Sequence, residues 1–194
     1  QNLSVAAHRP IIYPMNPLAI MLALSAALFL SAPPAVAATE DLSLSFTESS
    51  PVDLIVVENR SGCDLYDFGL QIDLRSSAGG LVFDISEGGA GASVYQPFEI
   101  LEGREAVRSF APVRDGDRIA SIQFGTLEAR RRVVFMVDVD DTATDGAWGQ
   151  TVIDGSEIAG TGLILTLVGE VPSTAVFLPD GQATLRIRGC GPVS

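Results

Sequence analysis

Four aspartates at and just after the end of one apolar run have the residue type and spacing of a cation site. The run VVFMVDVDD, residues 133–141, ends in Asp138, Asp140 and Asp141, and the loop that follows adds Asp145. On a β-strand, Asp138 and Asp140 would share one face, about 6–7 Å apart at their Cα atoms. Their carboxylates, with oxygens from Asp141 and Asp145, would suit calcium, which takes about six to eight oxygen ligands in flexible geometry.

Two other interpretations of these acids remain open. The first is a solvated strand face that runs into a turn, and the pattern favours it, because such a face needs no ligand. The second is a catalytic pair of carboxylates, which glycosidases hold about 5–9.5 Å apart in a sugar-binding cleft. Aromatic residues make up only 7% of the chain, so the sequence gives little sign of that cleft. The spacing of the acids also differs from the order of an EF-hand loop.

The residues that the chain lacks exclude most catalytic mechanisms. Its one histidine, His8, lies ahead of a predicted leader, and the sequence contains no lysine. Ser-His-Asp and Cys-His catalysis, histidine metal sites and Schiff-base chemistry are therefore excluded from the folded body. We predict that the protein is not an enzyme, with a carboxylate-dependent glycan-active enzyme as the alternative.

Three further features have both a structural and a functional interpretation. Asp115 and Asp117 flank a glycine, so a hairpin turn explains them better than a ligand role does. Arg130 to Arg132 form the one basic run; we expect them to pair with acids on a neighbouring strand rather than to bind a sulfate or carboxylate of a polysaccharide. Trp148 is expected to be partly buried in the core rather than to stack on a sugar ring.

Cys63 and Cys190 are the two cysteines of the chain. In an exported protein an even count predicts a disulfide, and two cysteines allow one pairing. A zinc site is the weaker alternative, because it needs further ligands such as histidine.

The N-terminal part of the chain has the pattern of an export signal. The apolar segment Leu18 to Leu30 is too short to span a bilayer, and small residues around Ala35 to Ala38 resemble a cleavage site. We expect residues 1–14 to be an upstream extension that is not native, residues 15–38 to be a signal peptide and residues 39–194 to be one domain. The protein would then be secreted or periplasmic, without stable membrane insertion after cleavage. An uncleaved membrane anchor is the alternative. A net charge of −12 argues against nucleic acid as a partner.

The rest of the chain alternates short strand patterns with turn signals. Leu42, Leu44 and Phe46 alternate with serines, as expected of a half-buried strand. After the leader, no window of ten or more residues has helical spacing. The sequence therefore predicts an antiparallel β-sandwich, immunoglobulin-like or jelly-roll-like, with a closed barrel as the alternative. The other expected strands are residues 54–58, 70–74, 81–85, 94–100, 106–110, 118–124, 131–140, 150–155, 162–169, 173–178 and 182–188.

Six segments follow one another in a fixed order: SFTESSPVD (45–53), SSAGGLVFD (76–84), YQPFEI (95–100), VRDGD (113–117), VDVDDT (137–142) and GSEIAGT (155–161). Together they resemble a family of small secreted bacterial proteins known as "aggregation factor core". The resemblance implies an exported, non-catalytic β-sandwich with a role in cell-surface adhesion or aggregation, assisted by calcium. Its partners would be a surface glycan, a surface protein or further copies of itself. A periplasmic accessory protein or inhibitor is a second alternative to this function.

Overall fold

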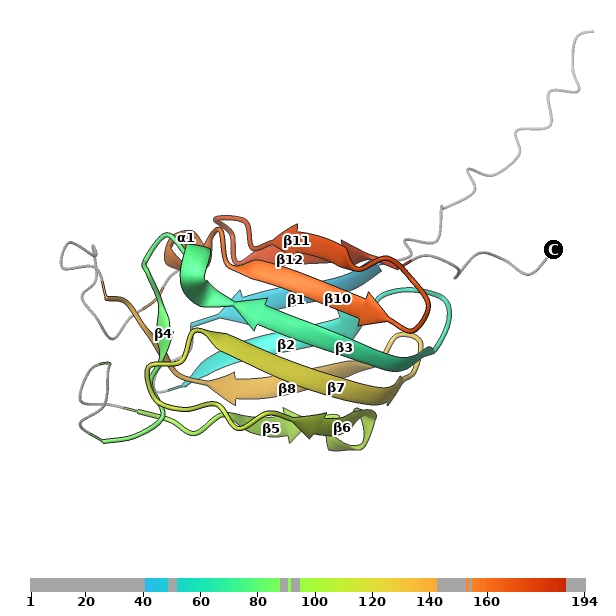
Figure 1. The fold of residues 1–194 in the computed structure, drawn as a ribbon, viewed down its shortest axis with the longest axis horizontal. Helices are drawn as coiled ribbons and strands as arrows, with labels where there is room; N and C mark the ends of the chain where they lie inside the picture. The colour runs from blue at the N-terminus through green and yellow to red at the C-terminus, as the bar shows by residue number, and fades with distance from the viewer. Residues whose placement is uncertain are drawn as a thin grey trace, which may run out of the picture. The chain divides into compact units, whose positions relative to one another are not determined.

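The protein is an all-β sandwich, which confirms the predicted fold class (Figure 1). The computed structural model describes residues 41–48, 52–87, 91, 95–142, 153 and 155–187. Predictions made for residues 1–38, Asp145, Trp148 and Cys190 concern residues outside the described part, so they stay predictions.

One antiparallel sheet, sheet A, contains both the first and the last strand that the structure describes. Its five strands have the order β12-β1-β2-β8-β5. Leu42 of β1 pairs with Leu185 of β12 on one side and with Asn59 of β2 on the other. The first and the last described strand are therefore neighbours in this sheet. The strands are β1 (Asp41–Thr47), β2 (Asp53–Asn59), β5 (Glu99–Glu102), β8 (Arg132–Val137) and β12 (Gln182–Arg186).

The second antiparallel sheet, sheet B, lies opposite sheet A. Its order is β11-β10-β3-β7-β6. The long central pair β3–β7 runs from Leu65 opposite Leu127 to Asp73 opposite Ile119. The strands are β3 (Leu65–Asp73), β6 (Val107–Phe110), β7 (Ile119–Leu127), β10 (Gly162–Leu167) and β11 (Ser173–Val176).

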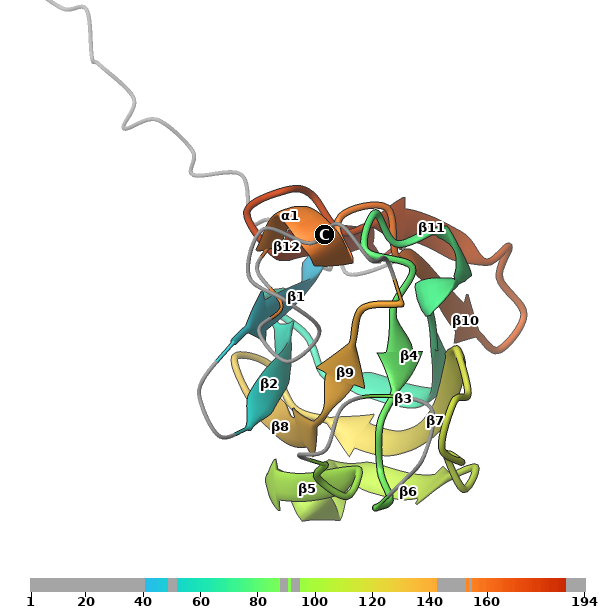
Figure 2. The same cartoon turned by 90° about the vertical axis from the view of Figure 1, so that its left-hand side faces the viewer.

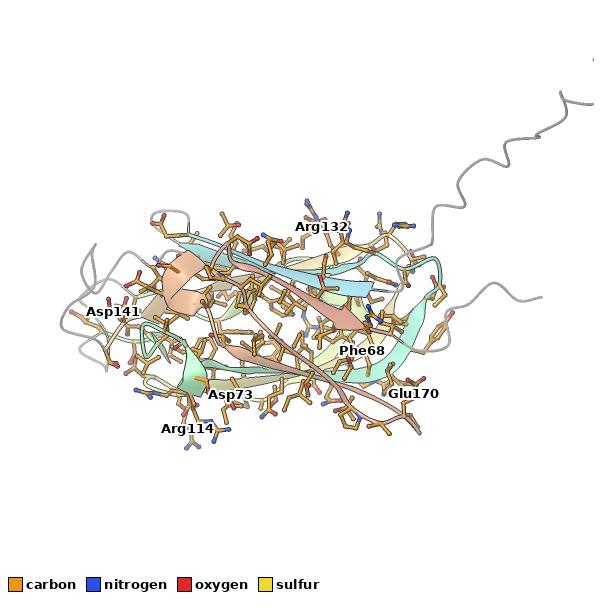
Figure 3. The ribbon with its side chains drawn as sticks, turned by 90° about the horizontal axis from the view of Figure 1, so that it is seen from above. Phe68, Asp73, Arg114, Arg132, Asp141 and Glu170 are labelled. Atoms are coloured by element: carbon orange, nitrogen blue, oxygen red, sulfur yellow. The ribbon has the colours of Figure 1, made fainter. Side chains whose placement is uncertain are left out.

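Apolar side chains at alternate strand positions fill the space between the sheets. Leu42 and Leu44 of β1 are fully buried, as the alternation in the sequence predicts. On sheet B, Phe68 and Phe124 stack with ring centroids 4.4 Å apart, and Figure 3 shows Phe68 between the two sheets. Each fully buried side chain of this size contributes about 1.5–3 kcal/mol of transfer free energy. This core makes the sandwich a rigid frame for what lies at its ends.

A small third sheet lies at one end of the sandwich. The two-residue strands β4 (Val82–Phe83) and β9 (Val139–Asp140) pair with each other, Val82 opposite Asp140 and Phe83 opposite Val139. Figure 2 looks onto this end and shows the β4–β9 ribbon between sheets A and B. Its apolar residues enter the core, since Phe83 is fully buried and Val139 is 1% exposed.

The prediction of one continuous strand over residues 131–140 is wrong. The segment forms two strands, β8 and β9, with Asp138 between them. Sheet A ends at this level, because the last pair of β8 with β2 is Val137 with Asp53. Beyond it the main chain would have no ladder partner, and unpaired buried main-chain groups are costly. The chain therefore turns into the mouth of the sandwich and pairs with β4.

Helix is confined to short turns in the described part of the chain. One α-helical turn, α1 (Gly155–Ile158), and two 3₁₀ turns at Leu74–Ser76 and Arg104–Ala106 connect strands. In these described ranges no helix has the length and apolar character needed to cross a membrane.

Candidate cation-binding site

The three aspartates at the end of the apolar run are buried, so their interpretation as a solvated strand face is wrong. Asp138, Asp140 and Asp141 are 9%, 1% and 2% exposed. The inward turn after Val137 explains the burial, because it carries all three residues into the mouth of the sandwich along with Val139. Figure 3 shows Asp141 at this end of the molecule.

Two further aspartates, which the sequence did not indicate as site residues, lie at the same end of the sandwich. Asp84 follows β4 and is fully buried, and Asp53 begins β2 and is 8% exposed. The main-chain N–H of Asp84 donates to the carbonyl of Asp138 over 3.0 Å, which fixes the two segments side by side. The position of Asp84 inside the apolar run LVFDI was the sequence feature that could have indicated a site residue. An acid within such a run is rarely buried unless it has a partner.

The carboxylates of Asp84, Asp115 and Asp140 form the centre of the cluster. The carboxyl group of Asp84 lies within hydrogen-bonding reach of those of both Asp115 and Asp140. Asp115 sits on the turn between β6 and β7, where its Oδ1 accepts from the Ile85 main-chain N–H over 3.1 Å. The predicted turn is present, with Gly116 at a φ of 75°, but the turn also brings Asp115 to Asp84, which turn chemistry alone did not predict.

Several carboxylate oxygens at this end of the sandwich lack a hydrogen-bond donor in the described part of the chain. Both carboxylate oxygens of Asp84 and of Asp141, and Oδ2 of Asp138, are buried without a partner among the described residues. Two ionised carboxylates both accept, so the contacts of Asp84 with Asp115 and Asp140 become hydrogen bonds only where a proton lies between them. An unpaired buried carboxylate is strongly unfavourable, so the cluster needs either protons or a cation.

Gly91 packs directly against Asp84 and Asp140, two of the three central acids. A Cβ atom at this position would collide with Oδ2 of Asp140 and lie 2.7 Å from Cγ of Asp84. Glycine is therefore required here by the close approach of its main chain to the carboxylates. Close-lying main chain is useful at a cation site, because calcium accepts carbonyl oxygens as well as carboxylates.

Burial raises the pKa values of three acids at this end of the sandwich, Asp53, Asp84 and Asp138. It raises the pKa of Asp53 to about 8, helped by the charge of Asp138 and opposed by the Val139 main-chain N–H. Burial, and then the charge of Asp140, raises the pKa of Asp138 to about 7. The pKa of Asp84 is also raised, by burial and by its contacts with Asp115 and Asp140. No arginine contributes to any of these three shifts, so the acids hold protons near neutral pH unless a cation replaces them.

A complete metal-coordination shell is not preformed in the described part of the chain. No group of three or more histidine, cysteine, aspartate or glutamate side chains there has the arrangement of a metal site as it stands. A calcium ion would have to complete its ligands with main-chain carbonyls, water or Asp145, the predicted ligand that lies outside the described residues. The acids best placed to bind such an ion are Asp84 and Asp140, with Asp115 and Asp138 beside them.

The side chains of the other predicted residues that the structure describes make their printed contacts outside this cluster. Asp117 caps its own turn, accepting from the Arg114 main-chain N–H over 2.7 Å. Within the basic run, the predicted cross-strand pairing is confirmed for Arg132, which pairs with Glu102 of neighbouring strand β5 over 2.9 Å. Arg131 instead lies 3.9 Å from Glu128, three residues earlier in the chain. Cys63 is not a free thiol; because Cys190 lies outside the described residues, the pairing of the two stays a prediction.

The chain was compared with protein-family models, with curated proteins and with solved structures, and none of them matches it. The family resemblance in the sequence therefore stays an expectation. The interpretation of the site depends on its own geometry.

Proposed function

We propose that this protein is an exported, non-catalytic β-sandwich that binds calcium at the β4–β9 end and acts in cell-surface adhesion or aggregation. The observation that carries the proposal is the buried carboxylate of Asp84, which has no donor for either oxygen and touches Asp115 and Asp140. Such a group is stable when ionised only if positive charge lies against it. The leader pattern and the resemblance in the sequence support export and adhesion.

The donor set favours calcium over other metals. The described acids offer hard oxygen ligands only, which suit calcium or magnesium rather than zinc or copper. Magnesium demands a near-ideal octahedron, whereas calcium tolerates irregular sets that include main-chain carbonyls. A cluster crowded between two sheets and a glycine main chain fits the more flexible ion.

Burial favours cation binding over catalysis at this cluster. A catalytic carboxyl group must touch its substrate, yet Asp84 is fully buried and Asp140 is 1% exposed. A dehydrated ion can reach oxygens that a sugar ring cannot. We therefore give the acids a structural role, in which the ion fastens the β4–β9 ribbon and the Asp115 turn across the mouth of the sandwich. The end loops so fixed would present the adhesive surface, as loops on a rigid β-scaffold commonly do.

Thermal unfolding of the whole protein with calcium, magnesium or a chelator tests the proposal. At a calcium concentration 100-fold above Kd, binding to the folded state adds about 2.7 kcal/mol, which is several degrees in Tm. We expect that rise in wild type, a smaller one with magnesium, and none in a variant with both Asp84→Asn and Asp140→Asn. Asn is nearly isosteric with Asp, so the variant keeps the packing while it removes the charge.

Glu170→Gln is the matched control, because it removes one acid at the far end of the sandwich from Asp141 (Figure 3). It should respond to calcium as wild type does. A wild-type Tm that is the same in calcium and in chelator would overturn calcium binding. An equal calcium response in the double variant would overturn the assignment of Asp84 and Asp140.

A further inference from the structure

The outer face of sheet B is uncharged over its middle, although the chain carries 24 acids and a net charge of −12. Figure 1 looks onto this face, with β10, β3 and β7 side by side across it. Leu70 and Ile72 of β3 are buried in the core, so Gln71 between them faces outward. By the same alternation, Ser121 and Gln123 of β7 face outward. Uncharged polar side chains therefore occupy the centre of the face.

Strand register places these side chains in two neighbouring rows. The first row is Thr174, Ile164, Gln71 and Ser121, and the second row is Thr166, Gly69 and Gln123. Residues two positions apart on a strand are about 6–7 Å apart. One small ligand can therefore contact both rows, and amide and hydroxyl groups from three strands converge on it.

A glycine leaves the second row hollow. Gly69 stands between Thr166 and Gln123 and has no side chain to fill the space above β3. The hollow there measures about 330 Å³, at the lower end of the range of about 300–1,000 Å³ that is usual for small-ligand sites. Its lining includes Gln71, Ser121, Gln123, Ile164 and Thr166.

A second hollow on the same face is mostly apolar. It measures about 380 Å³ and lies over β10 and β11, where Gly162 again lacks a side chain. Its walls include Val176 and Ile164, and Ile164 also lines the first hollow. The two hollows therefore adjoin and form one groove, the sheet B groove, which is polar over β3 and β7 and more apolar over β10 and β11.

The polar side chains of the sheet B groove keep their hydrogen-bonding groups free. Within the described residues, the side chains of Gln71, Gln123, Ser121 and Thr166 make no hydrogen bond or ion pair with the protein. An amide has two donors and an acceptor, and a hydroxyl group both donates and accepts. A ligand in the groove would therefore meet donors and acceptors in both roles.

The acids at the borders of the groove have cationic partners. Asp67 forms an ion pair with Arg108 of β6, and Asp73 accepts a hydrogen bond from Nε of Arg75 over 2.8 Å. These pairs neutralise the two acids beside the groove. The groove therefore stays close to neutral in an otherwise acidic molecule.

The outer face of sheet A has a different character. The β2–β8 pair places Glu58 opposite Arg132 and Leu54 opposite Met136. Alternation directs these four side chains outward, because Ile55, between Leu54 and the next outward residue, is fully buried. Charged and apolar side chains thus occupy the centre of sheet A, and the neutral polar groove belongs to sheet B.

We propose that the sheet B groove binds an uncharged glycan. The hydroxyl groups of a sugar both donate and accept, so they match the free amides and hydroxyl groups of the polar half. The C–H face of a sugar ring is apolar, and it packs on Ile164 and Val176 in the other half. The groove would hold two adjoining sugar units, one over each hollow.

Charge and composition favour this ligand over other partners. A net charge of −12 repels sulfated and acidic glycans. Because Asp67 and Asp73 are paired, the groove also offers little attraction to a basic partner. The centres of protein interfaces are enriched in aromatic residues, Met and Arg, whereas this groove consists of Gln, Ser, Thr, Gly and small aliphatic side chains.

This inference rests on the proposed function for its role, because adhesion to a cell surface needs a surface ligand, which the groove would bind in addition to any contact of the end loops. Affinity electrophoresis of the whole protein in native gels is the test. Three gels contain an uncharged polysaccharide (dextran, a galactomannan or a soluble galactan), one contains chondroitin sulfate and one contains none. We expect at least one uncharged polysaccharide to retard the protein and chondroitin sulfate to have no effect. Migration that no uncharged polysaccharide changes, or that only chondroitin sulfate changes, would overturn the proposal.

Two variants locate the site. The first combines Gln71→Glu with Gln123→Glu, which replaces two amides by carboxylates of nearly the same shape that accept but do not donate. The second is Gly69→Thr, which fills the hollow; its Cβ would meet only the movable end of the Gln123 side chain, at 3.0 Å. Both should raise the dissociation constant for the retarding polysaccharide at least tenfold, while the melting temperature stays close to that of wild type.

Gln182→Glu is the matched control, because it makes the same change on β12 of sheet A, at an exposed position. It should be retarded as wild type is. Equal retardation of wild type, both variants and the control would overturn the assignment to the sheet B groove.

The same gels run in chelator separate this inference from calcium binding. The groove needs no ion, so wild type in chelator and the variant with Asp84→Asn and Asp140→Asn should both be retarded as before. Retardation that requires calcium but not Gln71 and Gln123 would overturn the groove and leave the cation proposal standing. A melting temperature that ignores calcium, with retardation unchanged, would overturn the cation site and leave the groove.

Discussion

Asp84 and Asp140 place their carboxyl groups within hydrogen-bonding reach of each other in the mouth of a β-sandwich, although two ionised carboxylates cannot donate to each other. Asp84 is fully buried and Asp140 is 1% exposed, so bulk water cannot solvate the charge. The fold creates this contact by pairing β4 with β9, two residues each, across the open end of two large sheets. Stability should therefore depend on what neutralises the cluster.

Without a cation, the protein should lose stability as the pH rises from about 4 to about 8. Burial raises the pKa of Asp53 from 3.8 to about 8 and that of Asp138 to about 7. Between pH 3.8 and the folded-state pKa values of about 7 and about 8, the folded state holds protons that the unfolded state has lost. The free energy of unfolding therefore falls as pH increases over this range. The stability is fully present below pH 3.8 and is lost once the pH passes the folded-state pKa values.

Urea unfolding in chelator at pH 4, 6 and 9 measures this dependence. We expect a fall of several kcal/mol across the range, since each unit of pKa shift is worth about 1.4 kcal/mol. Calcium at pH 9 should restore much of the loss, because it replaces the protons. Stability that rises from pH 4 to pH 8 in chelator would contradict the burial of these acids.

Replacing Asp53 by asparagine should stabilise the protein at high pH. The ionised side chain is disfavoured by burial and by the charge of Asp138, whereas an amide is neutral and still accepts from the Val139 N–H. In chelator at pH 9, Asp53→Asn should raise the free energy of unfolding by roughly 1–3 kcal/mol. At pH 4 the gain should disappear, because Asp53 is then protonated in the folded state. A variant that is equally destabilised at both pH values would show that Asp53 acts through packing alone.

The sequence predicted most strands but not the state of the acids, for a definable reason. Alternation of apolar and polar residues is local, so Leu42, Leu44 and Phe46 predict β1 directly. Burial of Asp138 and Asp140 depends on a partner more than fifty residues away, since β9 needs the paired strand β4. Nothing in VDVDD itself shows that sheet A ends at Val137 and that the chain must turn inward. Whether such acids form a solvated strand face or a buried cluster is therefore decided by long-range strand pairing, which the local sequence does not show.

The predicted bridge between Cys63 and Cys190 should be present in protein that has been exported. On the chain-entropy model, a cross-link that closes a loop of about 100 residues stabilises by about 4–5 kcal/mol. Peptide mapping without reduction should yield one cross-linked peptide that contains both cysteines. Reduction should lower the melting temperature by about 10 °C or more. Two free thiols in protein purified from the periplasm or the medium would contradict the prediction.

Gly91→Ala should impair calcium binding through a single methyl group. The new Cβ would collide with Oδ2 of Asp140 and crowd Cγ of Asp84, so the two central carboxylates must separate. Gly62→Ala is the matched control, because a Cβ there meets no atom within 4 Å. We expect the calcium affinity of Gly91→Ala, measured by calorimetry, to fall at least tenfold and its stability in chelator to fall by about 1–3 kcal/mol. Gly62→Ala should match wild type in affinity, and equal affinity for both variants would show that the ion binds away from Asp84 and Asp140.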